Sequence, residues 1–239
     1  QPFNYVAASF VRRAQDVFDV KKLLVENGRP DIQIIAKIEN SEGVENIDEI
    51  LKIADGIMVA RGDLGVEVPA EDVPLIQKEV ITKCKDMGKL VITATQMLES
   101  MQQNPRPTRA EVSDVANAIF DGTDAIMLSG ESASGLYPQE AVMTMSKIAL
   151  KTENSLDYDA LHRQAVRTAP QDTSEAICMS VAEIASKFQV AAIIAFTESG
   201  FTARKMSRYR PEARIIAATP EVATTRALAI NWGAKPVKC

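Results

Sequence analysis

Short apolar runs alternate with longer amphipathic stretches along the first 150 residues of this 239-residue chain. Apolar runs of about five residues are typical of buried strands, whereas apolar residues spaced three and four apart indicate helices. The pattern predicts strands over residues 5–10, 32–38, 56–60, 90–95 and 125–128. It predicts helices between them over residues 14–27, 45–53, 73–87 and 110–120. Alternation at this spacing favours right-handed βαβ units and a parallel sheet.

The periodicity weakens between about residues 151 and 171 and then resumes. A new helix is predicted from Asp172 to Lys187. Beyond it, the pattern predicts a strand, a helix, a strand and a helix over residues 191–196, 201–208, 215–218 and 220–231. We therefore divide the chain into a first domain over residues 1–154 and a second, smaller α/β domain over residues 155–239.

Several predicted strands of the first domain end in polar or glycine-containing segments, at Ser9, Lys37–Glu39, Arg61–Asp63, Thr93–Gln96 and Ser129–Glu131. A (β/α)₈ barrel builds its active site from such strand ends, and an open doubly wound sheet gives a similar pattern. The pattern alone leaves both folds open. A closed barrel needs eight strands and five are predicted, so the barrel interpretation requires about three further βα units outside this sequence.

The strongest candidate chemistry lies in the segments Lys37-Ile38-Glu39 and Arg61-Gly62-Asp63. Because side chains alternate along a strand, Lys37 and Glu39 point to the same face. Glu39 and Asp63 are then candidates to hold one divalent cation beside the Lys37 ammonium, an arrangement that suits phosphoryl transfer or enolate formation. Each has a plainer interpretation, since Lys37 and Glu39 could form a solvated pair and Asp63 could form a turn.

Other segments give weaker signals. Gly62 allows a ligand to approach the backbone closely and leaves its N–H free to donate. Thr95 and Ser129 offer hydroxyl groups at strand ends. The segment Thr197-Glu198-Ser199-Gly200-Phe201-Thr202 joins a strand to a helix, so it could bind an anion or simply cap the helix. The single histidine, His162, is interpreted as a surface residue, which argues against a histidine triad or a zinc cluster.

Composition narrows the class of protein. A net charge of -5 and a pI of about 5.1 argue against a general nucleic-acid surface. The three cysteines lie far apart and form no C-x-x-C motif, which indicates a reducing compartment. The sequence contains no apolar run long enough to span a bilayer. We expect a soluble cytoplasmic protein with neither a nucleic-acid nor a membrane partner.

Taken together, five segments closely resemble motifs of the pyruvate kinase family, and they occur in the family's order. The segments are Ile35-Ala36-Lys37-Ile38-Glu39-Asn40, Met58-Val59-Ala60-Arg61-Gly62-Asp63-Leu64-Gly65-Val66-Glu67, Ala94-Thr95-Gln96-Met97-Leu98-Glu99-Ser100-Met101, Pro105-Arg106-Pro107-Thr108-Arg109-Ala110-Glu111-Val112 and Ile126-Met127-Leu128-Ser129-Gly130-Glu131. The likeness covers nearly the whole chain.

The resemblance implies an α/β fold made of a partial (β/α)₈ TIM barrel, followed by part of a second, smaller α/β domain. It implies transfer of the phosphoryl group of phosphoenolpyruvate to ADP in glycolysis, with Mg²⁺ or Mn²⁺ and commonly K⁺. Family members are usually allosteric homotetramers, and a sugar phosphate or a nucleotide is the expected effector. The early barrel strands, which carry most of the family's K⁺ ligands, have no counterpart here, so we expect this chain alone to be inactive.

The resemblance also implies roles for individual residues. Lys37 would stabilise charge on the transferring phosphoryl group and the enolate, while Glu39 and Asp63 would hold the divalent ion. Gly62 and Thr95 would contact phosphoenolpyruvate, as would Lys37 and Asp63. Thr95 would also lie near the route that protonates the enolate, with Ser129 and Glu131 as further members of that route.

Residues Thr197, Glu198, Ser199, Gly200, Phe201 and Thr202 resemble the family's effector-phosphate loop. Phe201 departs from the basic or hydroxyl residue that family members often carry at its place. Two alternatives stay open from the sequence. One is a Mg²⁺-dependent aldolase or lyase barrel that acts on 2-oxo acids. The other is a non-catalytic metabolite-binding module in which only the second domain matters.

Overall fold

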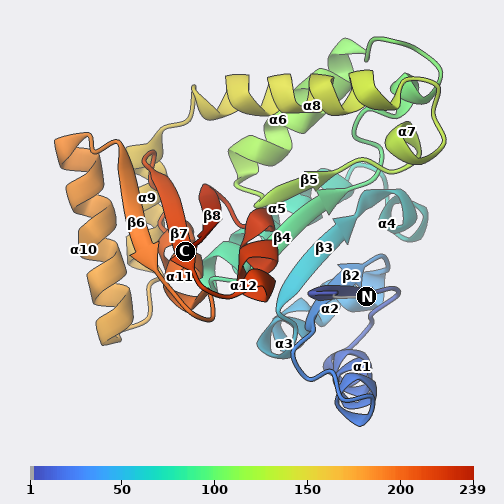
Figure 1. The fold of residues 1–239 in the computed structure, drawn as a ribbon. Coiled ribbons are helices and arrows are strands. Elements are labelled where there is room, and N and C mark those ends of the chain that lie inside the picture. Colours follow the sequence, from blue (N-terminus) through green and yellow to red (C-terminus); the bar gives the residue numbers. More distant parts are fainter. Residues whose placement is uncertain (1–2) are drawn as a thin grey trace. The chain divides into compact units, whose positions relative to one another are not determined.

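The computed structural model describes residues 3–239, which form two compact units (Figure 1). Val6–Cys84 and Lys89–Leu156 form one unit, and Asp157–Cys239 makes up most of the other. The polar strand ends from Ser9 to Glu131 lie in the first of these units, and the segment from Thr197 to Thr202 lies in the second.

The first sheet has five strands in the order β1-β2-β3-β4-β5. The strands are β1 (Tyr5–Ala8), β2 (Gln33–Ile38), β3 (Gly56–Ala60), β4 (Leu90–Ala94) and β5 (Ala125–Met127). The pairs β2·β3, β3·β4 and β4·β5 are parallel, and Ile38 of β2 lies opposite Val59 of β3. Each strand therefore neighbours the one before it in sequence, as in a barrel, whereas the strand order of a doubly wound sheet reverses at a switch point.

Helices follow each of these strands along the chain (Figure 1). They are α1 (Ala14–Glu26), α2 (Ser41–Glu45), α3 (Ile47–Ile53), α4 (Arg61–Glu67), α5 (Val73–Asp86), η1 (Glu99–Gln102), α6 (Arg109–Asp121), α7 (Gly130–Ala133) and α8 (Pro138–Glu153). Gly28 and Gly88 follow α1 and α5 and end them, and both have positive φ. Thr108 caps α6 and Glu111 closes a capping box with it.

Alternate residues of the strands pack against the helices and form the core of this unit. On β2 these are Ile34, Ala36 and Ile38, which are all at most 2% exposed and join a cluster with residues of α1, α3 and α5. Lys37 lies between two of them in the sequence and therefore points to the opposite face of the sheet. The alternation thus separates the core from the face that carries the candidate chemistry.

The structure also contains helices that the pattern does not predict. The predicted helix over residues 45–53 is two helices, α2 and α3, which meet at Asn46. Helix α8 is missing from the prediction, and it buries only Ala141, Met145 and Thr152. Helices α4 and α7 follow their strands directly, where the polar segments predict loops.

The second unit contains a parallel three-stranded sheet in the order β6-β7-β8. Its elements are α9 (Tyr158–Arg167), α10 (Thr173–Phe188), β6 (Ala192–Phe196), α11 (Phe201–Arg208), β7 (Arg214–Thr219), α12 (Val222–Ala227), η2 (Leu228–Ile230) and β8 (Ala234–Lys238). Helix α9 lies in the stretch where no helix is predicted, and none of its residues is buried. The predicted helix over residues 220–231 is divided into α12 and η2.

A buried tyrosine organises the interior of the second unit. The hydroxyl of Tyr209 donates to Oε2 of Glu175 at 2.6 Å, and burial together with this carboxylate raises the pKa of Tyr209. The ring of His162 lies with its centroid 6.0 Å from that of Tyr209, and its Nδ1 atom is buried. The prediction that His162 is a surface residue is therefore wrong: the side chain is half-buried against the tyrosine.

Among the described residues, no helix is both long enough and apolar enough to cross a membrane.

Candidate functional site

A lysine and a glutamate meet where β2 ends. Nζ of Lys37 lies 2.6 Å from Oε1 of Glu39 and donates to Oγ of Ser9 at 3.0 Å. The two side chains share one face of the sheet, as the period of two predicts. The side chain of Lys37 remains 23% exposed. An ammonium group has three N–H donors. In the part of the chain that the structure describes, the Lys37 ammonium has a hydrogen bond to Ser9 and an ion pair with Glu39.

Glu39 is almost completely enclosed, with 1% of its side chain exposed. Its Oε2 atom accepts the N–H of Phe10 at 2.5 Å, while Oε1 faces the Lys37 ammonium. Phe10 has φ of 54°, a left-handed conformation that aims its N–H at the carboxylate. A buried carboxylate needs such partners on both oxygens, because an unpaired one would lose its solvation without compensation.

Strand β3 is buried throughout and leads directly into α4 at Arg61. Asp63 lies in the first turn of α4 and is exposed. Because β2 and β3 are neighbours in parallel register, Glu39 and Asp63 follow their strands at the same edge of the sheet. Leu64 anchors the helix in the core, so the exposed carboxylate is carried on a fixed turn.

Thr95 follows β4 in an unusual backbone conformation. Thr95 and Gln96 have φ of 69° and 52°, and left-handed conformations cost roughly 1–3 kcal/mol for each non-glycine residue. The Thr95 hydroxyl accepts the N–H of Gly62 at 2.7 Å and donates to the carbonyl of Ala94 at 2.6 Å. The structure therefore brings together Gly62 and Thr95, and the Gly62 N–H donates to Thr95 instead of being free.

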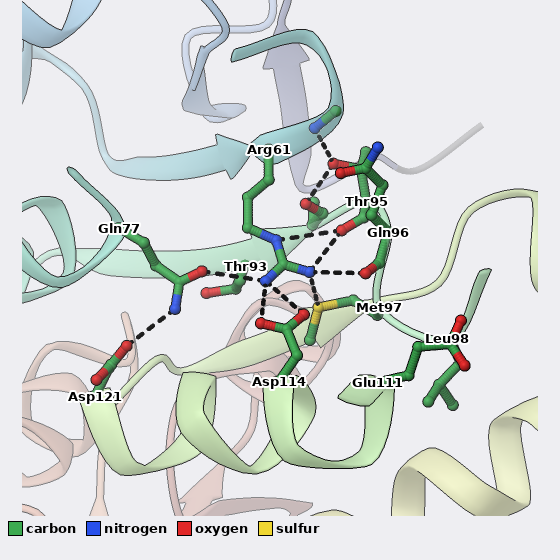
Figure 2. A network of polar contacts seen from close by, with 12 residues as sticks. Arg61, Gln77, Thr93, Thr95, Gln96, Met97, Leu98, Glu111, Asp114 and Asp121 are labelled. Carbon is green, nitrogen blue, oxygen red and sulfur yellow. Dashed lines mark hydrogen bonds and ion pairs between the residues drawn. The ribbon is translucent and has the colours of Figure 1, made fainter. Parts of the chain in front are cut away.

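The guanidinium of Arg61 holds the backbone of this turn (Figure 2). Its Nη2 atom donates to the carbonyls of Thr95 at 2.7 Å and Gln96 at 3.1 Å, and Nε donates to the Thr95 carbonyl at 3.2 Å. Nη2 also lies 2.8 Å from Sδ of Met97. Arg61 is 7% exposed, so its charge is buried among these acceptors.

Acidic and amide side chains complete the contacts of this guanidinium (Figure 2). Nη1 of Arg61 lies 2.7 Å from Oδ2 of Asp114 on α6 and donates to Oε1 of Gln77 on α5 at 3.3 Å. The amide of Gln77 donates in turn to Asp121 at 2.9 Å, and Asp121 also pairs with Lys78. The buried charge of Arg61 is thereby paired and hydrogen-bonded, as a buried charge requires.

Glu131 and Ser129 lie beyond β5. Glu131 is 2% exposed, and its two oxygens accept the N–H groups of Leu98 at 3.1 Å and Ser129 at 2.8 Å. This carboxylate therefore connects the segment after β4 to the segment after β5. Ser129 and Glu131 belong to the same set of strand ends as Lys37 and Thr95, on the sequential sheet.

Glu111 fixes the far end of the segment after β4. It accepts the N–H of Ser100 at 2.7 Å, the hydroxyl of Ser100 at 2.6 Å and the N–H of Thr108 at 2.7 Å. Burial by itself would raise the pKa of Glu111, but the hydrogen bonds from Ser100 and Thr108 outweigh it and lower the pKa.

In the second unit, the segment from Thr197 to Thr202 forms a tight turn before α11. The N–H of Gly200 donates to the Thr197 hydroxyl at 2.9 Å, and Gly200 has φ of 84°. The carbonyl of Glu198 accepts the Thr224 hydroxyl at 2.7 Å. Phe201 is half exposed, with Nζ of Lys205 4.9 Å from the centre of its ring. Ser199 and Thr202 are exposed.

Glu39 and Asp63 supply hard oxygen donors at the edge of the first sheet. Among residues 3–239, no three or more His, Cys, Asp or Glu side chains are grouped to hold a metal ion. Mg²⁺ is usually held by one or two carboxylates together with oxygens of a phosphorylated substrate, so it does not need such a group. Glu39 and Asp63 have the donor chemistry of such an ion, while both oxygens of Glu39 already meet Lys37 and the Phe10 N–H.

The role of Arg61 and its partners is the main feature that the sequence pattern does not predict. Arg61 is conspicuous in the sequence only as a charge placed directly after a fully apolar strand. Its partners lie 16 to 53 residues further along the chain, on α5, after β4 and on α6. Local periodicity carries no information on contacts of this length.

Comparison with known proteins identifies related sequences over both units. Residues 1–142 match the family model described as pyruvate kinase, barrel domain, and residues 175–239 match the one described as pyruvate kinase, alpha/beta domain. A protein named pyruvate kinase from Clostridium acetobutylicum is 55% identical over 237 residues, which is 99% of this chain and 50% of the relative. One of the same name from Geobacillus stearothermophilus is 60% identical over 233 residues, which is 98% of this chain and 40% of the relative. The chain thus spans about half the length of the curated relatives it matches, or less.

Proposed function

Because this chain belongs to the pyruvate kinase family, we propose that it is part of an enzyme that transfers the phosphoryl group of phosphoenolpyruvate to ADP. In that reaction the bond between phosphorus and the enol oxygen breaks, and a bond from phosphorus to a β-phosphate oxygen of ADP forms. The enolate left behind takes a proton on carbon, which gives pyruvate. Glycolysis is the pathway in which this reaction takes place.

The observation that carries the proposal is the pair formed by Lys37 and Glu39 at the end of β2. The side chain of Lys37 is 23% exposed while its acidic partner is buried, so the lysine is the more accessible member of the pair. Phosphoryl transfer passes through a loose transition state that needs little covalent help and much positioned positive charge. We assign Lys37 to stabilising the negative charge on the transferring group and on the enolate.

Glu39 and Asp63 are the residues that would hold Mg²⁺ or Mn²⁺. A divalent ion bound there supplies charge neutralisation for the substrate oxygens. The acidic donors, placed after two neighbouring strands, support this assignment. The K⁺ ion that the resemblance implies would take most of its ligands from outside this chain.

Gly62 and Thr95 are proposed to contact phosphoenolpyruvate, together with Lys37 and Asp63. The hydrogen bond between the Gly62 N–H and the Thr95 hydroxyl supports a common site for these two residues. We assign Thr95 to the route that protonates the enolate, and we include Ser129 and Glu131 in that route. The hydrogen bond from the Ser129 N–H to Glu131 supports placing these two together.

For the second unit we propose that residues Thr197, Glu198, Ser199, Gly200, Phe201 and Thr202 bind the phosphate of a sugar-phosphate or nucleotide effector. The exposed residues Ser199, before α11, and Thr202, in its first turn, support this. Titration with inorganic phosphate, followed by the fluorescence of a Phe201→Trp variant, tests the effector site.

We also propose that the boundary between the two domains lies between residues 154 and 155. The whole enzyme is proposed to be cytoplasmic and homotetrameric.

The decisive experiment is an assay for ADP-dependent release of pyruvate from phosphoenolpyruvate, on a full-length protein that carries this sequence. Pyruvate and ATP should form in equal amounts and only with Mg²⁺ or Mn²⁺ present. Cleavage of a 2-oxo acid without ADP would instead identify an aldolase or lyase. Sugar-phosphate binding without either reaction would identify a metabolite-binding module. The isolated 239-residue chain should give no measurable ATP in the same assay.

A further inference from the structure

We propose that Arg61 is a positioning residue that holds Thr95 in its working orientation, an inference that rests on the proposed role of Thr95 at the substrate site. The side chain of Arg61 is 7% exposed, and its guanidinium forms hydrogen bonds and an ion pair with other groups of the protein. Its function would therefore be exerted through the backbone that it holds.

The first step of the argument concerns the backbone of the turn. Thr95 and Gln96 are both left-handed, and Thr is β-branched, so the turn needs outside contacts to persist. Arg61 provides them, because one planar group donates to the carbonyls of both residues. Fixing two successive carbonyls fixes the two peptide planes and hence the direction in which the Thr95 side chain leaves the backbone.

The second step concerns the reverse contact. The residue next to Arg61 donates its own N–H to the Thr95 hydroxyl, at 2.7 Å. The start of α4 and the turn after β4 are thereby joined twice. The side chain of Arg61 contacts the backbone of the turn, and the side chain of Thr95 contacts the backbone of α4. Both links converge on Thr95, and neither uses the Lys37–Glu39 pair.

The third step explains why the residue is an arginine. The contacts need donors that point in several directions from a rigid plane: toward the Thr95 and Gln96 carbonyls, and toward Asp114 on the other side. A lysine ammonium is a point charge on a flexible stem and cannot reproduce this fork. Gln77, itself held by Asp121, closes the remaining side.

The test uses Arg61→Lys, which keeps the charge, and Arg61→Gln, which keeps two N–H donors, in a full-length protein that carries this sequence. We expect both variants to fold and to lower kcat by about 10²-fold, the loss typical of a small misplacement of a reacting group. The KM for ADP should change less than about threefold, because ADP is not a proposed ligand of Thr95. Circular dichroism and thermal unfolding establish the folded state.

A double-mutant cycle separates positioning from a purely structural role. If Arg61 acts through Thr95, adding Arg61→Lys to Thr95→Ala should lower kcat little further, within about threefold, because the orientation of the hydroxyl no longer matters. Additive losses would overturn the proposal. The matched control is Lys83→Gln on α5, which removes a cation that pairs with Asp48 and Glu79 but does not contact the turn. It should leave kcat unchanged.

The remaining outcomes also decide. Retention of wild-type kcat in Arg61→Lys and Arg61→Gln would overturn the inference, and so would loss of the folded state in both variants, because Arg61 would then be a stability residue. If the wild-type protein does not transfer phosphoryl groups at all, the proposed function fails first. If the wild type is active and Thr95→Ala is impaired, failure of the Arg61 variants to show a defect concerns this inference alone.

Discussion

Lys37 and Arg61 are basic residues at the ends of neighbouring parallel strands, and each has an acidic partner, yet their surroundings differ. Lys37 has a buried partner, Glu39, and is itself 23% exposed. Arg61 is the reverse: it is 7% exposed while its partner, Asp114, is 39% exposed. At the end of β2 the more buried member of the ion pair is the carboxylate, and at the end of β3 it is the cation.

The difference separates two uses of positive charge at one edge of a sheet. A cation that has a buried counter-ion and an exposed head can interact with a negatively charged ligand. A cation whose donors are all directed at backbone carbonyls and neighbouring side chains fixes the local structure instead. Substitutions at the two strand ends should therefore differ in what they change.

The largest effect is expected for Lys37→Met in a full-length protein that carries this sequence. Removing the ammonium takes away charge that is needed chiefly in the transition state, so kcat should fall by about 10²- to 10³-fold, the range measured for comparable electrostatic groups. Binding of phosphoenolpyruvate should persist. Steady-state kinetics and direct titration measure the two quantities, and near-normal kcat would remove Lys37 from the proposed mechanism.

A second substitution, Asp63→Asn, tests the acidic side of the same site. Because Asp63 is exposed on the first turn of α4, the change should leave the fold intact. The Mg²⁺ concentration needed for half-maximal rate should rise by about 10- to 100-fold, as found when metal sites lose a supporting group. Glu67→Gln at the other end of α4 is the control. An unchanged Mg²⁺ dependence in Asp63→Asn would exclude Asp63 as a ligand.

A third substitution, Asp114→Asn, tests the partly exposed ion-pair partner of Arg61. The guanidinium keeps its bonds to the Thr95 and Gln96 carbonyls in this variant, and Asp114 is partly solvated. Because these bonds to the turn remain, kcat should fall by less than about fivefold, which is about 1 kcal/mol at the scale of tenfold per 1.4 kcal/mol. A loss as large as that of Lys37→Met would contradict the division between the two strand ends.

The smallest effect is expected for Glu111→Gln, which affects stability. The lowered pKa of Glu111 in the folded protein means that its contribution is complete above the unfolded pKa of about 4.3. That contribution is lost as the pH falls through the lower, folded pKa. At pH 7 the variant should unfold about 1 kcal/mol more easily, the usual effect of losing a cap.

Urea unfolding between pH 7 and pH 3 measures this difference, which should shrink toward the acid end. Glu99→Gln serves as the control, because Glu99 is exposed on the same segment. A difference that grows as the pH falls would show that the sign of the pKa shift is wrong.

Strand positions followed closely from the sequence because buried parallel strands read as continuous apolar runs. The predicted strand over residues 56–60 is identical to β3, and the others agree within two residues at each end. Helices α8 and α9 were not predicted although their sequences are amphipathic, so a stripe was overlooked there and was not absent. Elements whose signal is a short local run were therefore predicted best.

The contacts of the candidate site also differ in whether their signal in the sequence is local. The contact between Lys37 and Glu39 depends only on the period of a strand, so it could be predicted. The contact between Arg61 and Thr95 depends on two positive φ angles at Thr95 and Gln96, neither of which is a glycine. No local preference in the sequence indicates that conformation, because the donors to its carbonyls come from a residue 34 and 35 positions away.

The sequential order of the parallel strands has a consequence for biosynthesis. Each strand from β3 to β5 pairs with the strand made just before it, so the sheet can grow in the direction of translation. Lys37 and Glu39 can meet once β2 has emerged from the ribosome. Arg61 must wait until the chain has been extended through β4 and α6 before its acceptors exist. We therefore expect a nascent chain halted before β4 to expose the unpaired edge and apolar side chains of β3, and so to become a substrate for chaperones.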